Sequence, residues 1–212
     1  MNNKIPGKKQ PLIQILEIGL EVWIRNQCKF ISKLDIELRG SIFTILSGKL
    51  SSVKLIAEQV NFKGLILSQI ELISGPIELS IDLSNKKQKI SFKKIFNIEG
   101  SISLTSENLK EIILSSKWEW IGSWLAENLL GVSNLESLEI EKEIIFLKGS
   151  GTELDNITVG EFYIEAKSGS LFFTNRNKDD SCLFPMDPSI YISQAIISNK
   201  GILISVRSSV NP

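Results

Sequence analysis

Residues 45–75 read ILSGKLSSVKLIAEQVNFKGLILSQIELISG, and this stretch decides the fold class. In its first half Leu55 and Ala57 lie two residues apart, so their side chains point to one face of an extended strand while charged residues point to the other. After a short polar break, Ile70 and Leu72 continue the same alternation. The pattern predicts two half-buried strands joined by a short turn, which pair in an antiparallel manner.

Similar alternations recur along most of the remaining chain. They occur at residues 32–41, 77–83, 96–104, 135–149, 156–174, 189–198 and 202–209. Breaks rich in Gly, Pro, Asn and Lys separate many of them. Runs of strands joined by short turns are typical of antiparallel sheets, and two helices interrupt the series. The sequence therefore predicts an α+β fold in which residues 11–212 form a single domain.

The first predicted helix begins at Pro11, a residue that suits the first helical position. Its polar residues recur at helical spacing, at Gln14, Glu17, Glu21 and Arg25. Its apolar residues cover much of the remaining circumference, and these are Leu12, Ile13, Leu16, Leu20, Trp23 and Ile24. Because this helix is apolar over more than half of its surface, it needs cover from more than one direction.

The second predicted helix covers residues 106–130. Thr105 or Ser106 can cap its first turn, and Gly131 can terminate it. Gly122 and a pair of serines weaken its middle, so the pattern allows one kinked helix or two shorter helices.

Three tryptophans lie close together in this second helix. Trp120 and Trp124 are four residues apart and share one helix face, whereas Trp118 points elsewhere. Two interpretations remain open for them. They pack in the core, or they contact a ligand or a membrane interface, because Trp suits a boundary between apolar and wet surroundings.

The composition narrows the classes of function. The 24 basic residues balance the 24 acidic ones, and a neutral chain lacks the basic surplus that nucleic-acid binding needs. There is no histidine, which excludes Ser-His-Asp triads, Cys-His pairs and histidine metal sites. Cys28 and Cys182 are too few for a disulfide framework, and we expect both to be free thiols. We predict a protein without catalysis, without a metal and without a cofactor.

The N-terminal region and the length of the apolar stretches indicate where in the cell the protein is located. No stretch of the sequence reaches the roughly 18–20 apolar residues that span a bilayer. Glu17 and Glu21 interrupt the apolar part and no small-residue cleavage site follows, so we expect no signal peptide and a location that is cytoplasmic or peripheral on the cytoplasmic face of a membrane. Residues 1–10 are expected to form a flexible basic tail that contains Lys4, Lys8 and Lys9. This tail either attracts anionic headgroups or only solubilises the chain.

Three segments carry a family resemblance. Residues 46–72, LSGKLSSVKLIAEQVNFKGLILSQIEL, combine a Leu-Ser-Gly turn, an alternating strand and a Leu-Ser-x-Ile-x-Leu strand. Residues 99–116 and 187–209 supply a strand-then-helix step and a closing hairpin. Together they resemble the LmeA-like phospholipid-binding family, formerly described as a domain of unknown function. The resemblance extends over residues 11–209 and is nearest to the branch found in photosynthetic bacteria.

This resemblance implies phospholipid binding in or near the cell envelope. It also implies an architecture similar to tubular lipid-binding domains, in which a long twisted antiparallel sheet wraps around a helix. The chain differs from actinobacterial members in showing no recognisable export signal. The shared motifs are structural, so they assign no ligand-contact residue.

Residue patterns and resemblance lead to one hypothesis. A curved sheet covers two amphipathic helices and leaves an apolar slot that holds acyl chains. The residues expected to line or gate this slot are Leu12, Ile13, Leu16, Leu20, Trp23, Trp120 and Trp124. The expected partner is a phospholipid or a membrane surface, which Lys4, Lys8 and Lys9 would contact. The alternative is an interaction module with a closed core, which docks a protein partner through a sheet edge or the tryptophan helix.

Overall fold

The computed structural model describes residues 11–82, 89–151, 157–178 and 180–212. The predicted basic tail at residues 1–10 lies outside these ranges. The helices of the described part are α1 (Pro11–Gln27), α2 (Ile42–Leu46), α3 (Ser106–Leu114) and α4 (Glu119–Leu125), and α4 continues as a π-helical turn, η1 (Ala126–Leu130). None of them is long and apolar enough to cross a bilayer.

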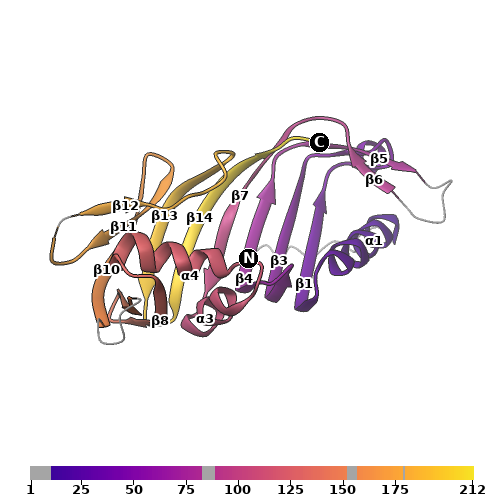
Figure 1. Cartoon of the computed structure of the whole chain (residues 1–212). Coiled ribbons are helices and arrows are strands. Elements are labelled where there is room, and N and C mark those ends of the chain that lie inside the picture. Colours follow the sequence, from indigo (N-terminus) through magenta and orange to yellow (C-terminus); the bar gives the residue numbers. More distant parts are fainter. Residues whose placement is uncertain (1–10, 83–88, 152–156, 179) are drawn as a thin grey trace, which may run out of the picture.

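The largest sheet has six antiparallel strands in the order β1-β3-β4-β7-β14-β13. Their bounds are β1 Phe30–Arg39, β3 Ser52–Phe62, β4 Leu65–Ser74, β7 Phe96–Leu104, β13 Ile190–Ser198 and β14 Gly201–Val210. The predicted hairpin within residues 45–75 forms β3 and β4. The C-terminal strand β14 lies between β7 and β13, and the whole sheet curves into an arch (Figure 1).

Two smaller sheets continue the arch at its ends. The five-stranded sheet has the order β12-β11-β10-β9-β8, and the three-stranded sheet has the order β2-β5-β6. Their bounds are β8 Asn134–Glu141, β9 Ile144–Ser150, β10 Ile157–Lys167, β11 Ser170–Asn175, β12 Ser181–Leu183, β2 Lys49–Leu50, β5 Ile77–Asp82 and β6 Lys89–Phe92. The strand pairing is antiparallel throughout the described residues, so the predicted α+β class is confirmed.

The second predicted helix is in fact two helices, α3 and α4. This is one of the two alternatives that the sequence allowed. Thr105 begins α3 with a capping box: its hydroxyl accepts from the backbone N–H of Asn108, whose side chain accepts from the backbone N–H of Thr105, both at 3.1 Å. Gly131 ends η1 in the left-handed region with φ 69°, a conformation that glycine adopts without cost. The short helix α2, which Ser41 caps, was not predicted.

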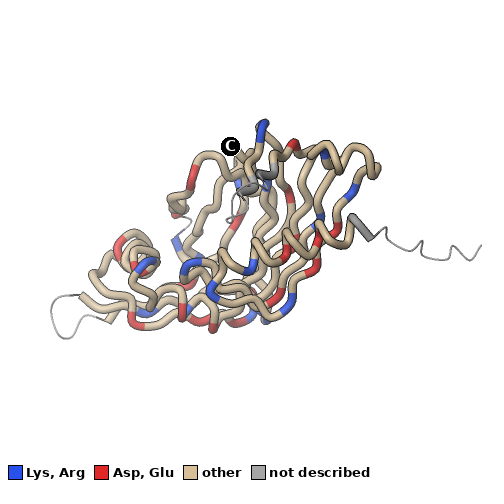
Figure 2. Tube along the Cα trace, turned by 90° about the vertical axis from the view of Figure 1, so that its right-hand side faces the viewer, with Lys and Arg blue, Asp and Glu red and all other residues tan. Residues whose placement is uncertain are grey.

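Helices α1, α3 and α4 cover one face of the arch, which we call the inner face. In Figure 1, α1 lies under the β1 end, and α3 and α4 lie towards the β14 and β13 end. The outer face carries charged side chains among apolar ones. Its cross-strand ion pairs are Lys33–Glu58 (3.1 Å), Lys54–Glu71 (2.7 Å) and Glu99–Arg207 (3.8 Å). Figure 2 shows acidic and basic residues interspersed along the sheet rather than gathered in patches of one sign.

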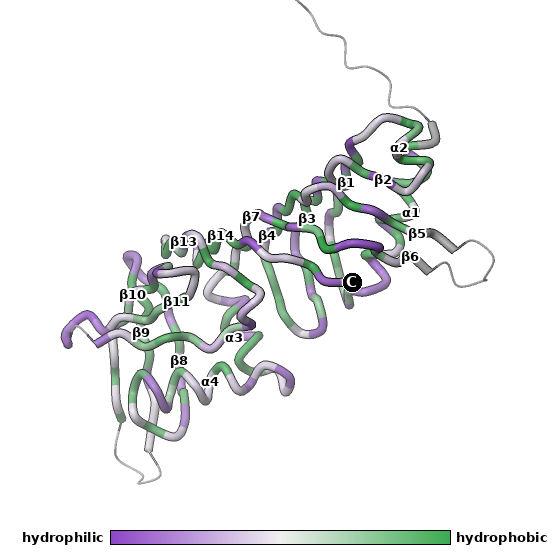
Figure 3. The backbone as a smooth tube through the Cα atoms, turned by 90° about the horizontal axis from the view of Figure 1, so that it is seen from above, coloured by the Kyte–Doolittle hydropathy of each residue, from purple (hydrophilic) through white to green (hydrophobic). Residues whose placement is uncertain are grey.

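Three apolar clusters form the core, and they follow the arch from end to end. The first, under α1 and α2, is built on Leu38, Ile45, Leu50, Ile77 and Phe96. The second lies between α3 and the middle strands, and the third joins α4 and η1 to the five-stranded sheet. Figure 3 shows α1 and α2 at one end of the molecule and the five-stranded sheet at the other.

Candidate functional site

The inner face of the six-stranded sheet is apolar across its full width. Residues that lie opposite one another in an antiparallel register point to the same face. One such row is Leu34, Ala57, Ile70, Ile102, Ile204 and Ala195. The next row is Ile36, Leu55, Leu72, Gly100, Val206 and Ile192. Neither row contains a polar side chain, so together they form an uninterrupted hydrocarbon floor.

This floor is covered unevenly. Leu34 and Ala57 are buried at its β1 side and Ile192 at its β13 side, where the helices pack. Leu55, Leu72 and the other middle residues of the second row are only half-buried. In Figure 1 the strands β3, β4 and β7 lie between α1 and α4. Helix α3 packs on these strands at the first row, where Ile70 and Ile102 join the second cluster, and the middle of the second row stays half-buried.

Gly100 marks the centre of this region. A Cβ atom built on Gly100 would overlap the backbone carbonyl of Glu71 on the neighbouring strand. Glycine at this position lets β4 and β7 approach closely. The resulting backbone geometry brings Leu72 and Val206 to either side of a position without a side chain.

Helix α1 forms one wall beside the floor. Ile13, Leu16 and Leu20 pack against the first cluster, and Ile24 packs against the second. These four residues include three of the predicted slot residues. The side chain of Leu12 lies outside the described part of the structure.

The polar stripe of α1 has a structural use that the sequence did not reveal. The Glu17 carboxylate accepts a hydrogen bond of 3.0 Å from the backbone N–H of Leu38, and the Arg25 guanidinium donates one of 2.9 Å to the carbonyl of Ile31. Arg25 is also paired with Glu21 at 2.9 Å. Because β1 is the edge strand of the sheet, these bonds satisfy backbone groups that no further strand pairs.

Trp23 lies on the flank of α1 that faces away from this stripe. At 100° per residue, Trp23 is about 160° around the helix from Glu21 and about 60° from Leu20. Its side chain is half-buried. Since Glu17 and Arg25 face the edge of β1, Trp23 lies on the flank of α1 that is turned away from that edge.

The other two tryptophans of the predicted slot, Trp120 and Trp124, lie at the far end of the arch. Trp124 packs edge-on against Phe184 with ring centroids 5.0 Å apart, and Trp120 stacks on the same ring at 5.8 Å. Trp124 also contacts Phe173 at 5.7 Å. Trp120 and Trp124 thus meet each other through Phe184, but the structure does not bring them to the α1 wall that holds Trp23.

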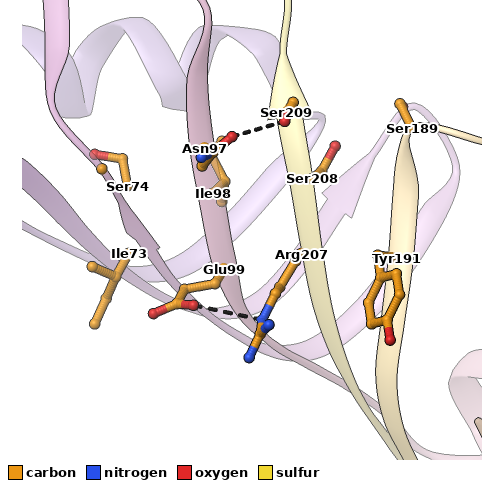
Figure 4. A pocket seen from close by; sticks show the side chains of 11 residues that line it. Ile73, Ser74, Asn97, Ile98, Glu99, Ser189, Tyr191, Arg207, Ser208 and Ser209 are labelled. Atoms are coloured by element: carbon orange, nitrogen blue, oxygen red, sulfur yellow. Dashed lines mark hydrogen bonds and ion pairs between the residues drawn. The ribbon is translucent and has the colours of Figure 1, made fainter. Parts of the chain in front are cut away.

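Two surface hollows lie elsewhere. One, of about 440 Å³, opens on the outer face, where Glu99, Arg207 and Tyr191 lie in one row and Ser209 donates a 2.7 Å hydrogen bond to Asn97 (Figure 4). The other, of about 740 Å³, lies where the β8–β9 turn meets β10 and β13. Both have mixed polar linings, so neither resembles the apolar slot that was predicted.

The two cysteines are free thiols, as predicted. Burial raises the pKa of the Cys28 thiol, which lies just beyond α1 beside the second cluster. A thiol with a raised pKa is a poor nucleophile at neutral pH. Cys28 therefore behaves as a small apolar residue of the core.

Comparisons with known proteins complete this description. The family model of LmeA-like phospholipid-binding proteins matches residues 9–174. That range runs from α1 to β11, so the C-terminal hairpin of β13 and β14 lies beyond it although it resembles the family's closing hairpin. No curated protein and no solved structure matches the chain. The match covers most of the sequence and agrees with the resemblance seen in its motifs, and the chain belongs to the LmeA-like phospholipid-binding family.

Proposed function

We propose that this protein binds a phospholipid without catalysis and holds its acyl chains against the middle of the inner face. The observation that carries the proposal is the second cross-strand row, from Ile36 to Ile192, which is apolar on every strand and only half-buried in its middle. The family's description as phospholipid-binding supports a lipid as the ligand.

Burial of acyl chains on this floor supplies the driving force. Each methylene group removed from water contributes about 0.8 kcal/mol before the costs of ordering. A floor without polar side chains imposes no requirement for hydrogen bonds, so it accepts chains of different length. Leu55, Leu72 and Val206 would make the closest contacts.

The predicted slot residues keep distinct roles in this proposal. Ile13, Leu16 and Leu20 form the α1 wall, Leu12 stays a proposed lining residue, and Trp23 gates entry to the inner face from the flank of α1. Trp120 and Trp124 border the lipid at the opposite end of the inner face, where Trp120 is 40% exposed. The protein works peripherally on a membrane, from which the lysines at positions 4, 8 and 9 recruit anionic lipid.

A volume-filling substitution tests the site. We expect Leu72→Trp to fill the middle of the floor and to remove co-purifying phospholipid, as read by native mass spectrometry and lipid extraction of the same sample. Ile73→Trp is the matched control, because the neighbouring residue points to the outer face. Equal lipid occupancy in the two variants, with both folded, would exclude the inner face as the site.

A protein-docking module is the second candidate function. It is favoured by Ile157 and Val159 on β10, which are 59% and 65% exposed although both are large and apolar. Wild-type protein that carries no lipid and takes none up from phosphatidylglycerol vesicles would favour this alternative.

A further inference from the structure

The outward side of α1 carries a second apolar surface, opposite the side that packs into the core. Ile15, Ile18 and Val22 are 63%, 58% and 54% exposed. Their spacing of three and four residues places them in one line along the helix. We call these three residues the outer ridge. The core does not account for them, because Leu16 and Leu20 already fill the contact with the first cluster.

The short helix α2, at the same end of the molecule, also carries exposed apolar side chains. Phe43 and Leu46 are 82% and 61% exposed, whereas Ile45 between them is buried in the cluster that also holds the inner side of α1. Figure 3 shows α1 and α2 at the same end of the molecule. Single exposed apolar residues are ordinary, but three large ones in one line along α1 indicate an interaction surface.

The sequence that leads into α1 favours a negatively charged occupant. Lys4, Lys8 and Lys9 immediately precede α1 in the sequence, with no acidic residue among residues 1–10. The nearest carboxylates on α1 are engaged within the protein, Glu17 by the N–H of Leu38 and Glu21 by Arg25. A row of aliphatic side chains beside a run of lysines is typical of helices that lie in the interface of an anionic bilayer.

We propose that the outer ridge seats the protein on an anionic phospholipid bilayer with α1 parallel to the membrane plane. This inference rests on the proposed function, since the bilayer is then the source of the bound lipid. The two sides of α1 would then differ in role: the outer ridge lies in the membrane interface, and the opposite side holds the first cluster at the edge of the inner face. Trp23 lies on the flank between them, so an acyl chain would have to pass only one helix diameter, about 10 Å.

The test compares two substitutions of the same chemistry at sites that are both more than half exposed. Val22→Asp places a charge on the outer ridge, and Val159→Asp places one on β10 in the five-stranded sheet. Flotation with vesicles of phosphatidylcholine and phosphatidylglycerol in equal amounts is the measurement. We expect Val22→Asp to weaken vesicle partitioning at least about tenfold and Val159→Asp to leave it unchanged. Removing the lysines, in a Lys4→Gln, Lys8→Gln, Lys9→Gln variant, should weaken binding to these vesicles and leave binding to pure phosphatidylcholine unaffected.

The outcomes separate this inference from the proposed function. Loss of flotation in Val22→Asp with normal retained lipid supports the outer ridge as a membrane contact, and this result would stand even if Leu72→Trp showed that the inner face holds no lipid. Flotation of Val22→Asp equal to that of the wild type overturns the inference. So does a wild-type protein that does not float and is a dimer by light scattering, with Val22→Asp a monomer, because the ridge would then contact a second copy.

Discussion

The two ends of the inner face are covered by helices that are held in different ways. At the far end, Trp124 packs among Phe173, Phe184 and the third cluster, so α4 is fixed mainly by apolar contacts. At the near end, α1 has an apolar contact too, but Glu17 and Arg25 also fasten it to the edge of β1, and its opposite side remains apolar and exposed. The comparison teaches that the far helix serves the core, whereas the near helix has a second surface to offer.

Truncating one tryptophan at each end gives the largest contrast in stability. We expect Trp124→Ala to lower the free energy of unfolding by about 3 kcal/mol, because it leaves a cavity among aromatic rings. Trp23→Ala should cost only about 1 kcal/mol, since the side chain is half-buried at the margin of the core, while retained lipid is lost. Urea denaturation monitored by far-ultraviolet circular dichroism measures both. Equal losses of stability would show that the two ends are built alike.

A smaller loss of stability should follow when the hydrogen bond between α1 and β1 is removed. Glu17→Ala removes the acceptor of the Leu38 N–H, and we expect a loss of about 1 kcal/mol together with faster hydrogen exchange at that amide. Glu21→Ala is the control, because Glu21 pairs with Arg25 on the same helix and leaves the Leu38 bond intact. Unchanged exchange at Leu38 in Glu17→Ala would mean that the α1 contact with β1 does not depend on this bond.

The smallest change in stability is expected when the pH is lowered. Hydrogen bonds from Lys94 lower the pKa of Glu78 at the near end, and hydrogen bonds from Lys148 and Ser150 lower the pKa of Glu136 at the far end. A carboxylate whose pKa is lower in the folded state stabilises the fold above its ordinary pKa of 4.5, and this stabilisation is lost as the pH falls through the folded value.

Thermal unfolding between neutral pH and about pH 3 measures this loss. Because these carboxylates are at the surface, we expect the unfolding temperature to fall by only a few degrees. The unfolding temperature of Glu136→Gln should fall less between these pH values than that of the wild type. Glu78→Gln should show a similar reduction of this fall. If the unfolding temperature falls by the same amount in both variants and in the wild type, other groups cause the acid sensitivity.

The sequence predicted those parts of the fold that depend on local pattern. The alternation of Leu55 and Ala57 with Ile70 and Leu72 placed these residues on one face, and the structure confirms this by pairing Ala57 with Ile70 and Leu55 with Leu72. The helical period of α1 and the end of η1 at Gly131 were also readable from sequence, since capping and amphipathicity act within a few residues.

The remaining features depend on contacts between distant segments. Side-chain period alone cannot show that the stripe of Glu17 and Arg25 faces a strand edge rather than solvent, because that depends on where α1 docks. Ile15, Ile18 and Val22 were readable as apolar residues, but only the docked position of α1 shows that nothing in the described structure covers them. The separation of Trp23 from Trp124 was hidden for the same reason: the curvature of the sheet sets the distance between the helices.

The position of β14 has a consequence for how the protein folds as it is made. This strand fills the place between β7 and β13, and its Ser209 bonds to Asn97, 112 residues earlier in the chain. At a synthesis rate of about 5–20 residues per second, β14 is made roughly 5–20 s after β7. The edge of β7 stays unpaired during this interval. Pairing over such a separation is slow in itself. During that interval the half-built arch presents an unpaired apolar strand, so the nascent chain depends on prompt capture of that edge to avoid association with its neighbours.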